Sequence, residues 1–181
     1  MITLGNQSDE DLMLLVQKGD ELAYAELFAR HKRGVYGYTR RFIRDEAQAQ
    51  EVFQDAWLKV HRASKTYRKG ARFKTWLYTI TANTTRDAYR QSQRRIQTVD
   101  SAIEPTARQT QFTSGMDLQA AIAALPENLR EAFLMGAIQG FDHKEVATAL
   151  DISPSNARAR ISRARAALRK ALKAETNEGG A

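Results

Sequence analysis

The fold of the C-terminal half of the chain is decided by GFDHKEVATALDISPSNARARISRARAALRKALK, residues 140–173. A short amphipathic helix is predicted over residues 143–150, because apolar side chains recur there at helical spacing. Asp151 follows where the chain must turn sharply, and Asp tolerates a left-handed backbone better than most residues other than glycine. Ser153 is a good N-cap and Pro154 suits the first helical position, so a second, longer helix begins there.

The second helix combines an apolar stripe with a strongly basic remainder. Its stripe, at steps of three or four residues, consists of Ala157, Ile161, Ala164, Leu168 and Leu172. No acidic residue occurs from Pro154 to Ala174, whereas seven arginines and lysines lie on its other faces up to residue 173. Two helices joined by a tight turn, the second one basic, are typical of a helix-turn-helix that reads a DNA major groove. The alternative is a solvated basic helix at the end of a helical bundle.

Composition narrows the possible functions. The 181 residues carry a net charge of +7, which favours a polyanionic partner. Cysteine is absent, which excludes disulfides and thiolate metal sites, and the three histidines show no ligand spacing, so we expect no metal site and no cofactor. The acidic N-terminus is no signal peptide, and no apolar run reaches the roughly 20 residues that span a bilayer. We therefore expect a cytoplasmic protein that does not insert into membranes.

The first half of the chain predicts three further helices. Ser8 or Asp9 can cap one that ends near Lys18, Asp20 can cap a second, and Asp45 can open a third. The buried stripe predicted for the third helix is Ala49, Val52, Phe53, Ala56, Trp57 and Val60. Its opposite face carries Glu51, Gln54, Asp55 and Leu58. An acidic face with an apolar residue in it suits docking on a basic partner surface, although an ordinary solvated face would look similar.

A basic loop and a fourth helix follow. The loop, SKTYRKGAR at 64–72, precedes a helix predicted to end at residue 95. We expect Phe73, Trp76, Leu77 and Ile80 to face the core. The other side is predicted to carry Tyr78, Ala82, Arg86 and Tyr89. Aromatic rings among cationic groups suit single-stranded nucleic acid, because rings stack on bases while cations follow phosphates. Tyrosines that merely cover the surface are the alternative.

The helical pattern breaks after residue 95. Residues 96–116 are rich in Gln, Thr and Ser and lack an apolar stripe, which predicts a flexible linker. Two helices are expected next, over 117–124 and 126–139, packing beneath the helix-turn-helix. The sequence thus predicts an all-α protein of two small domains, 1–95 and 117–174, followed by a frayed tail at 175–181.

Four of these stretches together resemble the extracytoplasmic-function (ECF) group of bacterial sigma factors. They are AQEVFQDAWLKV at 49–60, RFKTWLYTITANTTRD at 72–87, ALPENLREAF at 124–133 and the helix-turn-helix at 140–172. The resemblance implies a non-enzymatic factor that binds core RNA polymerase and directs initiation at particular promoters. It also implies control by an anti-sigma protein. The first domain then corresponds to sigma region 2 and the second to sigma region 4.

The resemblance also assigns roles to residues. Docking on a coiled coil of the largest polymerase subunit falls to Glu51, Gln54, Asp55 and Leu58. Contacts with the −10 element fall to Lys69, Arg72, Lys74, Tyr78, Asn83, Arg86 and Asp87. Within that set Asn83 and Asp87 would reach base edges and the cations would reach phosphates. Contacts with the −35 element fall to Ser155, Asn156, Arg158, Ala159, Ser162 and Arg163, where an arginine can grip a guanine bidentately.

Three positions depart from the usual pattern of the group. Gln50 stands where an acid is common, Asp151 where glycine is common, and Ala157 where a larger β-branched residue is common. Two other functions stay open on sequence grounds. One is a stand-alone helix-turn-helix regulator that binds an operator without polymerase. The other is a DNA-processing enzyme, which the lack of clustered carboxylates and of a glycine-rich phosphate loop disfavours.

Overall fold

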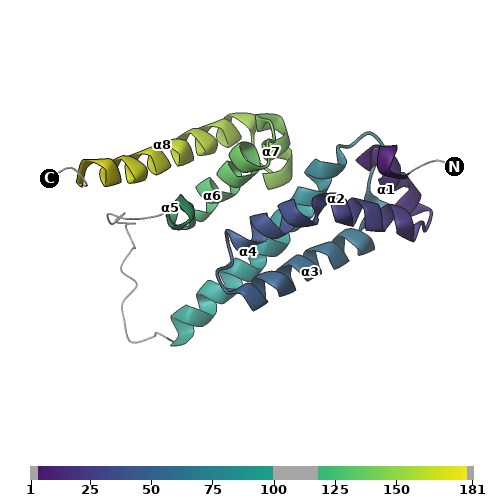
Figure 1. The fold of residues 1–181 in the computed structure, drawn as a ribbon, viewed down its shortest axis with the longest axis horizontal. Coiled ribbons are helices and arrows are strands. Elements are labelled where there is room, and N and C mark those ends of the chain that lie inside the picture. Colours follow the sequence, from purple (N-terminus) through teal and green to yellow (C-terminus); the bar gives the residue numbers. More distant parts are fainter. Residues whose placement is uncertain (1–3, 100–117, 179–181) are drawn as a thin grey trace. The chain divides into compact units, whose positions relative to one another are not determined.

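The computed structural model describes residues 4–99 and 118–178, which form helices joined by turns and loops, with no strand among them. Their contacts divide the chain into two compact units, residues 1–88 and 89–181. The all-α, two-domain architecture predicted from the sequence is therefore confirmed. Each unit is described separately below, and Figure 1 follows the chain through both.

In its described part, from residue 4 onward, the first unit contains four α-helices and two short 3₁₀ turns. In chain order these are η1 (Leu4–Asn6), α1 (Asp9–Gln17), α2 (Glu21–Arg40), α3 (Glu46–Arg62), η2 (Ser64–Thr66) and the first part of α4 (Phe73–Val99). Helix α2 packs against both α1 and α3. The largest fully buried side chains of this unit are Leu12, Met13, Leu27, Val35, Tyr38, Phe73, Leu77 and Tyr78.

Side-chain caps start the first three α-helices where the sequence predicted them. The Ser8 Oγ accepts the Asp11 N–H at 3.1 Å. Asp20 and Asp45 cap α2 and α3 in the same way, accepting backbone N–H groups at 3.0 and 2.7 Å. Each cap satisfies a donor that the helix itself leaves without a partner, and such a cap contributes about 1 kcal/mol.

The second unit is organised around its last helix. Among the described residues, it contains the last part of α4, followed by α5 (Leu118–Ala124), α6 (Glu127–Phe133), the π-helical segment η3 (Leu134–Ile138), α7 (His143–Leu150) and α8 (Pro154–Glu178). Helix α8 packs against α5, α6 and α7. Four of the five stripe residues predicted for α8 are at most 4% exposed, while Leu172 is half-buried and Ala171 takes its place in the core. The helix-turn-helix bounds, 143–150 and 154 onward, match the prediction.

A buried arginine joins α5 to α6. The Arg130 side chain is 5% exposed, and its Nη2 donates to the carbonyls of Ala123 and Leu125 at 2.5 and 2.9 Å. These carbonyls lie at the C-terminal end of α5, where helix geometry leaves acceptors unpaired. Arg130 therefore caps the end of one helix from inside the next.

The predicted helix ends were wrong at three places. Helix α4 continues to Val99, so residues 96–99 are helical and do not belong to a linker; residues 100–117 lie outside the described part of the chain. Helix α8 likewise continues to Glu178, into the predicted tail. In both cases the polar sequence contains no Gly or Pro at that point, and extending an existing helix by one residue costs little. The predicted helix 126–139 is instead split between α6 and η3.

Candidate protein and nucleic-acid interfaces

Helix α3 presents the predicted acidic face to solvent. Glu51 and Gln54 are exposed, Asp55 is half-buried, and the Leu58 residue is 53% exposed. The Asp55 carboxylate pairs with the Lys59 Nζ at 2.9 Å, one helical turn along. The structure thus brings all four predicted residues onto one accessible face, with an apolar side chain among the polar ones.

The opposite side of α3 is fixed by aromatic packing. The Trp57 ring contacts Phe28 with centroids 4.9 Å apart and Tyr24 with centroids 6.0 Å apart. The Tyr24 hydroxyl donates to the Trp57 carbonyl at 2.9 Å, and burial raises the pKa of Tyr24 to about 12. Phe53, expected in the core, is half-buried and packs its ring against Phe28 and Tyr36. This packing fixes the position of α3 and therefore of its acidic face.

The basic loop between α3 and α4 is held at its base. The Gln17 Nε2 donates to the carbonyls of Ser64 and Tyr67 at 2.9 and 2.8 Å. Tyr67 is buried, and its hydroxyl donates to the Ala71 carbonyl. The Glu10 carboxylate accepts the N–H of Phe73, the first residue of α4, at 3.0 Å. These bonds keep the loop in one position although its tip is exposed.

The loop and one face of α4 bring several predicted nucleic-acid contacts together. Lys69 and Arg72 are exposed on the loop, and Asn83 and Asp87 are exposed one turn apart on α4. The Arg86 Nη1 donates to the Asn83 Oδ1 at 3.0 Å, which leaves the Asn83 amide N–H groups available to a ligand. This face offers donors, acceptors and positive charge within a short distance along the helix.

Two residues of the predicted −10 set do not share this face. Lys74 is half-buried and lies nine residues before Asn83, which at 3.6 residues per turn places it on the opposite side of α4. The Tyr78 side chain is 1% exposed and packs edge-on against Tyr38 with ring centroids 5.8 Å apart. Burial raises the pKa of its phenol, which is a property of a core residue.

The stacking role assigned to Tyr78 is accordingly wrong, because this ring has no face open to a base. Trp76, which the sequence placed in the core, is half-buried beside Tyr67 and Phe73. It lies on the same side of α4 as Asn83, two turns earlier. Of these two rings, Trp76 is the one next to the polar face.

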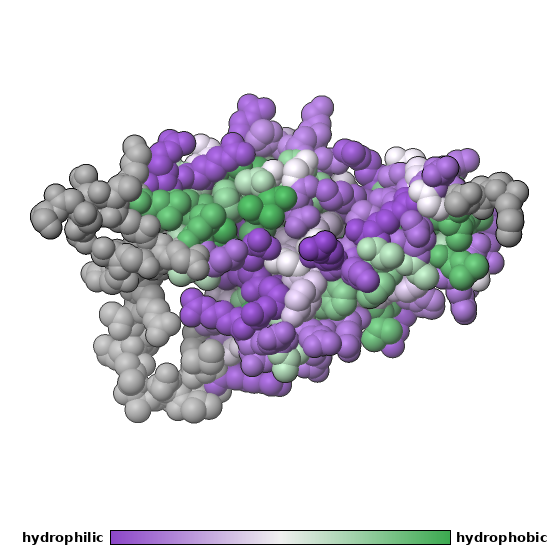
Figure 2. Space-filling view, in the orientation of Figure 1, coloured by the Kyte–Doolittle hydropathy of each residue, from purple (hydrophilic) through white to green (hydrophobic). Residues whose placement is uncertain are grey.

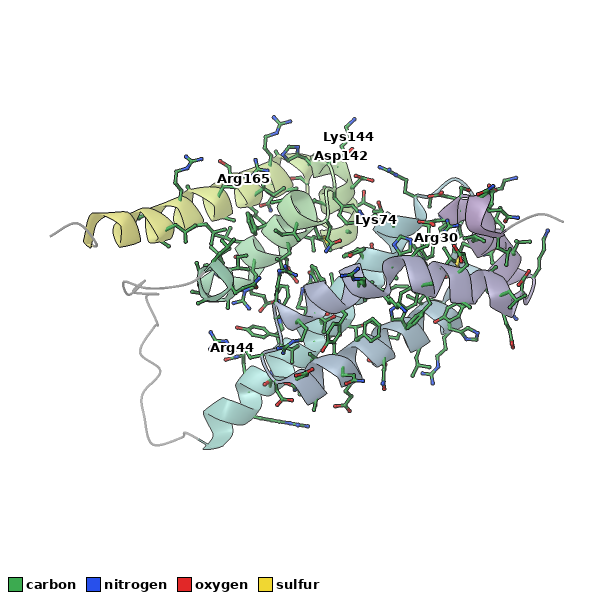
Figure 3. All side chains as sticks on the ribbon, viewed as in Figure 1. Arg30, Arg44, Lys74, Asp142, Lys144 and Arg165 are labelled. Carbon is green, nitrogen blue, oxygen red and sulfur yellow. The ribbon has the colours of Figure 1, made fainter. Side chains whose placement is uncertain are left out.

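The helix-turn-helix is built as the sequence predicted. The Asp142 Oδ1 accepts the N–H groups of Lys144 and Glu145 at 2.8 Å, and the Glu145 carboxylate accepts the Asp142 N–H, so a complete capping box starts α7. Figure 3 labels Asp142 and Lys144 at this end of α7. Asp151 has φ +53° and ψ +53°, the predicted left-handed turn, and the Asn156 N–H donates to the Ser153 Oγ at 3.2 Å.

The outer face of α8 carries the predicted −35 contacts. Arg158, Ser162 and Arg163 are exposed and Ala159 is half-buried. Ser155 and Asn156 are exposed near the start of the helix, where the Asn156 Oδ1 accepts a bond from the Arg160 Nε at 3.1 Å. Asn156 and Arg160 thus form a pair on one flank of the helix, away from Arg158 and Ser162.

A hollow of about 330 Å³ lies along the other flank of α8. Its lining consists of His143, Arg158, Ile161, Ser162, Arg165, Ala166 and Arg169. Three arginines and a histidine with no carboxylate among them make this hollow suited to a phosphate group. The sequence interpretation missed His143, Arg165 and Arg169. The sequence pattern could have indicated Arg165 and Arg169, because residues 158, 162, 165 and 169 repeat at helical spacing along one face.

The described residues contain no group of His, Cys, Asp or Glu side chains that could hold a metal ion. Within the same residues, no helix combines the length and the apolar character needed to cross a bilayer. Figure 2 shows a surface that is mostly hydrophilic with several apolar areas. Among the described residues, the large apolar side chains that are exposed are Leu22, Leu58, Leu118 and Ile138.

Comparison with known proteins matches both halves of the chain. Residues 27–95 match the family model "Sigma-70 region 2", and residues 115–168 match "Sigma-70, region 4". The chain is similar to the RNA polymerase sigma-H factor of Pseudomonas aeruginosa, with 31% identity over 93% of this chain and 96% of the relative. It is also 33% identical to the RNA polymerase sigma factor CarQ of Myxococcus xanthus and 30% identical to the ECF RNA polymerase sigma-E factor of Escherichia coli. These two alignments cover 85% and 89% of this chain and 91% and 92% of the relatives.

Solved structures show the same fold. CnrH, in complex with the cytosolic domain of CnrY, superposes with a TM-score of 0.72 at 26% identity, covering 93% of this chain and 99% of that one. The sigma factor RpoE of Bartonella quintana, in complex with the anti-sigma factor NepR, gives a TM-score of 0.69 at 22% identity, covering 83% and 96%. At that identity the second likeness concerns the fold alone.

Proposed function

The chain belongs to the extracytoplasmic-function group of RNA polymerase sigma factors. On this premise we propose which of its surfaces binds core polymerase and which bind the −10 and −35 elements of the promoter. As a sigma factor it binds core RNA polymerase and directs it to promoters. The alternative of a stand-alone regulator is set aside, because the relatives match along nearly the whole chain and not only at the helix-turn-helix. We propose that it performs no catalysis itself and acts in the cytoplasm.

One observation supports this assignment best: the two units expose helix faces of opposite charge. The first unit exposes the acidic face of α3 at Glu51 and Asp55, whereas the second exposes the basic face of α8. An acidic face repels DNA and suits a basic protein surface. A basic helix with a tight preceding turn suits a major groove. The acidic face is thus the polymerase-docking surface, and α8 is the −35 reader.

The −10 element is assigned to the loop and the exposed face of α4. Lys69, Arg72 and Arg86 hold the phosphates of the opened strand, and Asn83 and Asp87 contact base edges. Trp76 replaces Tyr78 as the ring beside which an unstacked base can rest, and such stacking contributes about 1–3 kcal/mol per base. Lys74, on the other side of α4, is left out of this set.

Mutant holoenzymes test this assignment. Trp76→Ala should shorten the lifetime of the open promoter complex at least about fivefold, as expected for the loss of one stacked base, and Trp76→Phe should restore most of it. Tyr78→Phe, the matched control in the core, should leave the lifetime unchanged. Asp87→Ala should change preference at one −10 position, whereas Arg72→Ala should weaken all promoters alike. An open complex that responds to Tyr78→Phe and not to Trp76→Ala would refute the assignment.

The hollow on α8 refines the −35 site. Arg158 and Ser162 line it together with Arg165 and Arg169, so base reading and phosphate binding share one flank of the helix. Arg165 is labelled on α8 in Figure 3. Removing one cation that binds a phosphate should reduce the salt dependence of DNA binding by about one charge. Arg169→Ala should therefore lower the salt slope without changing the preferred sequence.

We also propose that an anti-sigma protein controls this factor. Two solved structures with this fold contain a second protein, named as an anti-sigma factor in the complex of Bartonella quintana RpoE. Co-purification from the native host with a tagged copy of the chain tests the proposal. A stoichiometric partner that blocks polymerase binding would support it, and a factor that remains active and partner-free under all growth conditions would contradict it.

A further inference from the structure

The passage from α6 to α7 contains a widened helical turn. In η3 the Gln139 N–H donates to the Leu134 carbonyl at 3.0 Å, five residues back, and the Phe141 N–H then donates to the Met135 carbonyl at 3.1 Å. A π-turn holds more residues than an α-turn and usually marks a site where the chain needs an unusual register. Gly136 lies inside this turn.

Gly136 of η3 lies close to side chains of both helices of the helix-turn-helix. A Cβ atom added at Gly136 would lie 2.6 Å from the Ile161 Cδ1 and 3.3 Å from its Cγ1, both on α8. It would also lie 3.8 Å from a methyl group of Val146, on α7. With the Ile161 side chain in this position, only a residue without a side chain fits at 136, since carbon atoms in contact are normally about 3.5–4.0 Å apart. The glycine therefore leaves the space that the Ile161 side chain of α8 occupies against η3.

Ile161 connects this contact to the DNA-reading face. Its side chain is 4% exposed and belongs to the same turn of α8 as Arg158 and Ser162. Ile161 also lines the basic hollow. We propose that Gly136 is a positioning residue for −35 recognition, which places Arg158 and Ser162 through its contact with Ile161.

A methyl group at position 136 can be accommodated in two ways. Helix α8 can move outward, which displaces the Arg158 guanidinium from its base. Alternatively, the end of the Ile161 side chain can rotate away, which alters the lining of the hollow because Ile161 is part of it. Both responses change the surface that faces DNA. A bidentate contact tolerates little displacement, so discrimination at the base that Arg158 contacts should fall about tenfold.

The test is a selection from promoters with a randomised −35 element by the reconstituted holoenzyme. Wild type, Gly136→Ala and the double variant Gly136→Ala with Ile161→Val are compared, because valine lacks the Cδ1 atom that the new methyl would meet. Ala137→Gln, an exposed change in the same π-turn, is the control. Thermal unfolding of each variant is measured in parallel. The expected result is relaxed −35 preference for Gly136→Ala alone, with recovery in the double variant.

This inference rests on the proposed −35 role of α8, and the selection separates the two. A wild-type factor without −35 preference would overturn that role, and the positioning role with it. A wild-type factor with a clear preference that Gly136→Ala fully retains would overturn the positioning role alone. If Gly136→Ala unfolds, the double variant decides: wild-type melting and preference support the role, and continued unfolding overturns it.

Discussion

Reversal of charge on α3 is the sharpest test of the polymerase-docking surface. The perturbation is Glu51→Arg with Asp55→Arg, which changes the net charge by four. The fold should tolerate it. The Asp55–Lys59 pair that this variant removes lies between side chains 45–47% exposed, and such pairs contribute only about 0.3–0.5 kcal/mol. The variant exchanges the like-charge pair of Glu51 and Asp55 for a like-charge pair of arginines, so this contribution stays about the same, and a new arginine beside Lys59 costs a few tenths of a kcal/mol.

The effect on binding should be far larger. We expect Glu51 and Asp55 to be buried against polymerase in the complex; truncating one partner of a buried, hydrogen-bonded charge pair in an interface costs about 2–5 kcal/mol, and reversal adds repulsion. Two such truncations at the lower limit amount to about 4 kcal/mol, or about a 1,000-fold weaker Kd. Unfolding should meanwhile shift by no more than about 1 kcal/mol.

The assay is a titration of labelled factor with core polymerase at two salt concentrations, together with thermal unfolding of each variant. The control is Asp11→Arg with Glu21→Arg, which makes the same change of net charge at exposed positions on α1 and α2. If the control weakens binding as much as the α3 variant does, overall charge and not this face determines docking. If the α3 variant binds like wild type, the docking assignment is refuted.

Three further predictions concern the helix-turn-helix and the N-terminal region. Arg158→Ala should lower −35 discrimination by about 1–3 kcal/mol at one base. Arg160→Ala, which removes the same charge from the opposite flank, should weaken the binding of all DNA sequences alike. A uniform effect of both variants in a binding selection would mark Arg158 as a phosphate contact. Asp151→Gly should raise the free energy of unfolding by about 0.5 kcal/mol and Asp151→Ala should lower it by about 1 kcal/mol, because φ is +53° there; equal melting temperatures would contradict this. The hydrogen bond from His31 at 2.6 Å holds the pKa of Asp9 below its ordinary value of 3.8, so the stability it contributes is complete above that pH and is lost as the pH falls below it. Asp9→Asn should reduce this loss of stability at low pH, measured as the free energy of unfolding at a series of pH values. An equal loss in the variant would contradict the prediction.

Features set by local sequence could be predicted well. The caps at Ser8, Asp20 and Asp45, the turn at Asp151 and the start of α8 at Pro154 depend on residues a few positions apart, and the structure has each where it was expected. The exposed acidic face of α3 also followed from periodicity alone. Local rules suffice here because capping and helical spacing act within one or two turns.

Features set by distant partners could not be predicted in the same way. Tyr78 and Trp76 are both aromatic and two positions apart, and which of them is buried depends on Tyr38 of α2, 40 and 38 residues away. The π-turn at Gly136 has no signature in spacing, because the close approach of Ile161 is a tertiary contact. His143 joins the hollow for the same reason: α7 packs beside α8.

The most direct test of the central claim is assembly of the purified chain with bacterial core RNA polymerase, followed by mapping of transcription starts on a genomic library. The account predicts a stable one-to-one complex that initiates at a narrow set of promoters sharing −35 and −10 elements, and little duplex binding by the chain alone. Tight duplex binding by the chain without polymerase, and no complex with core, would contradict it.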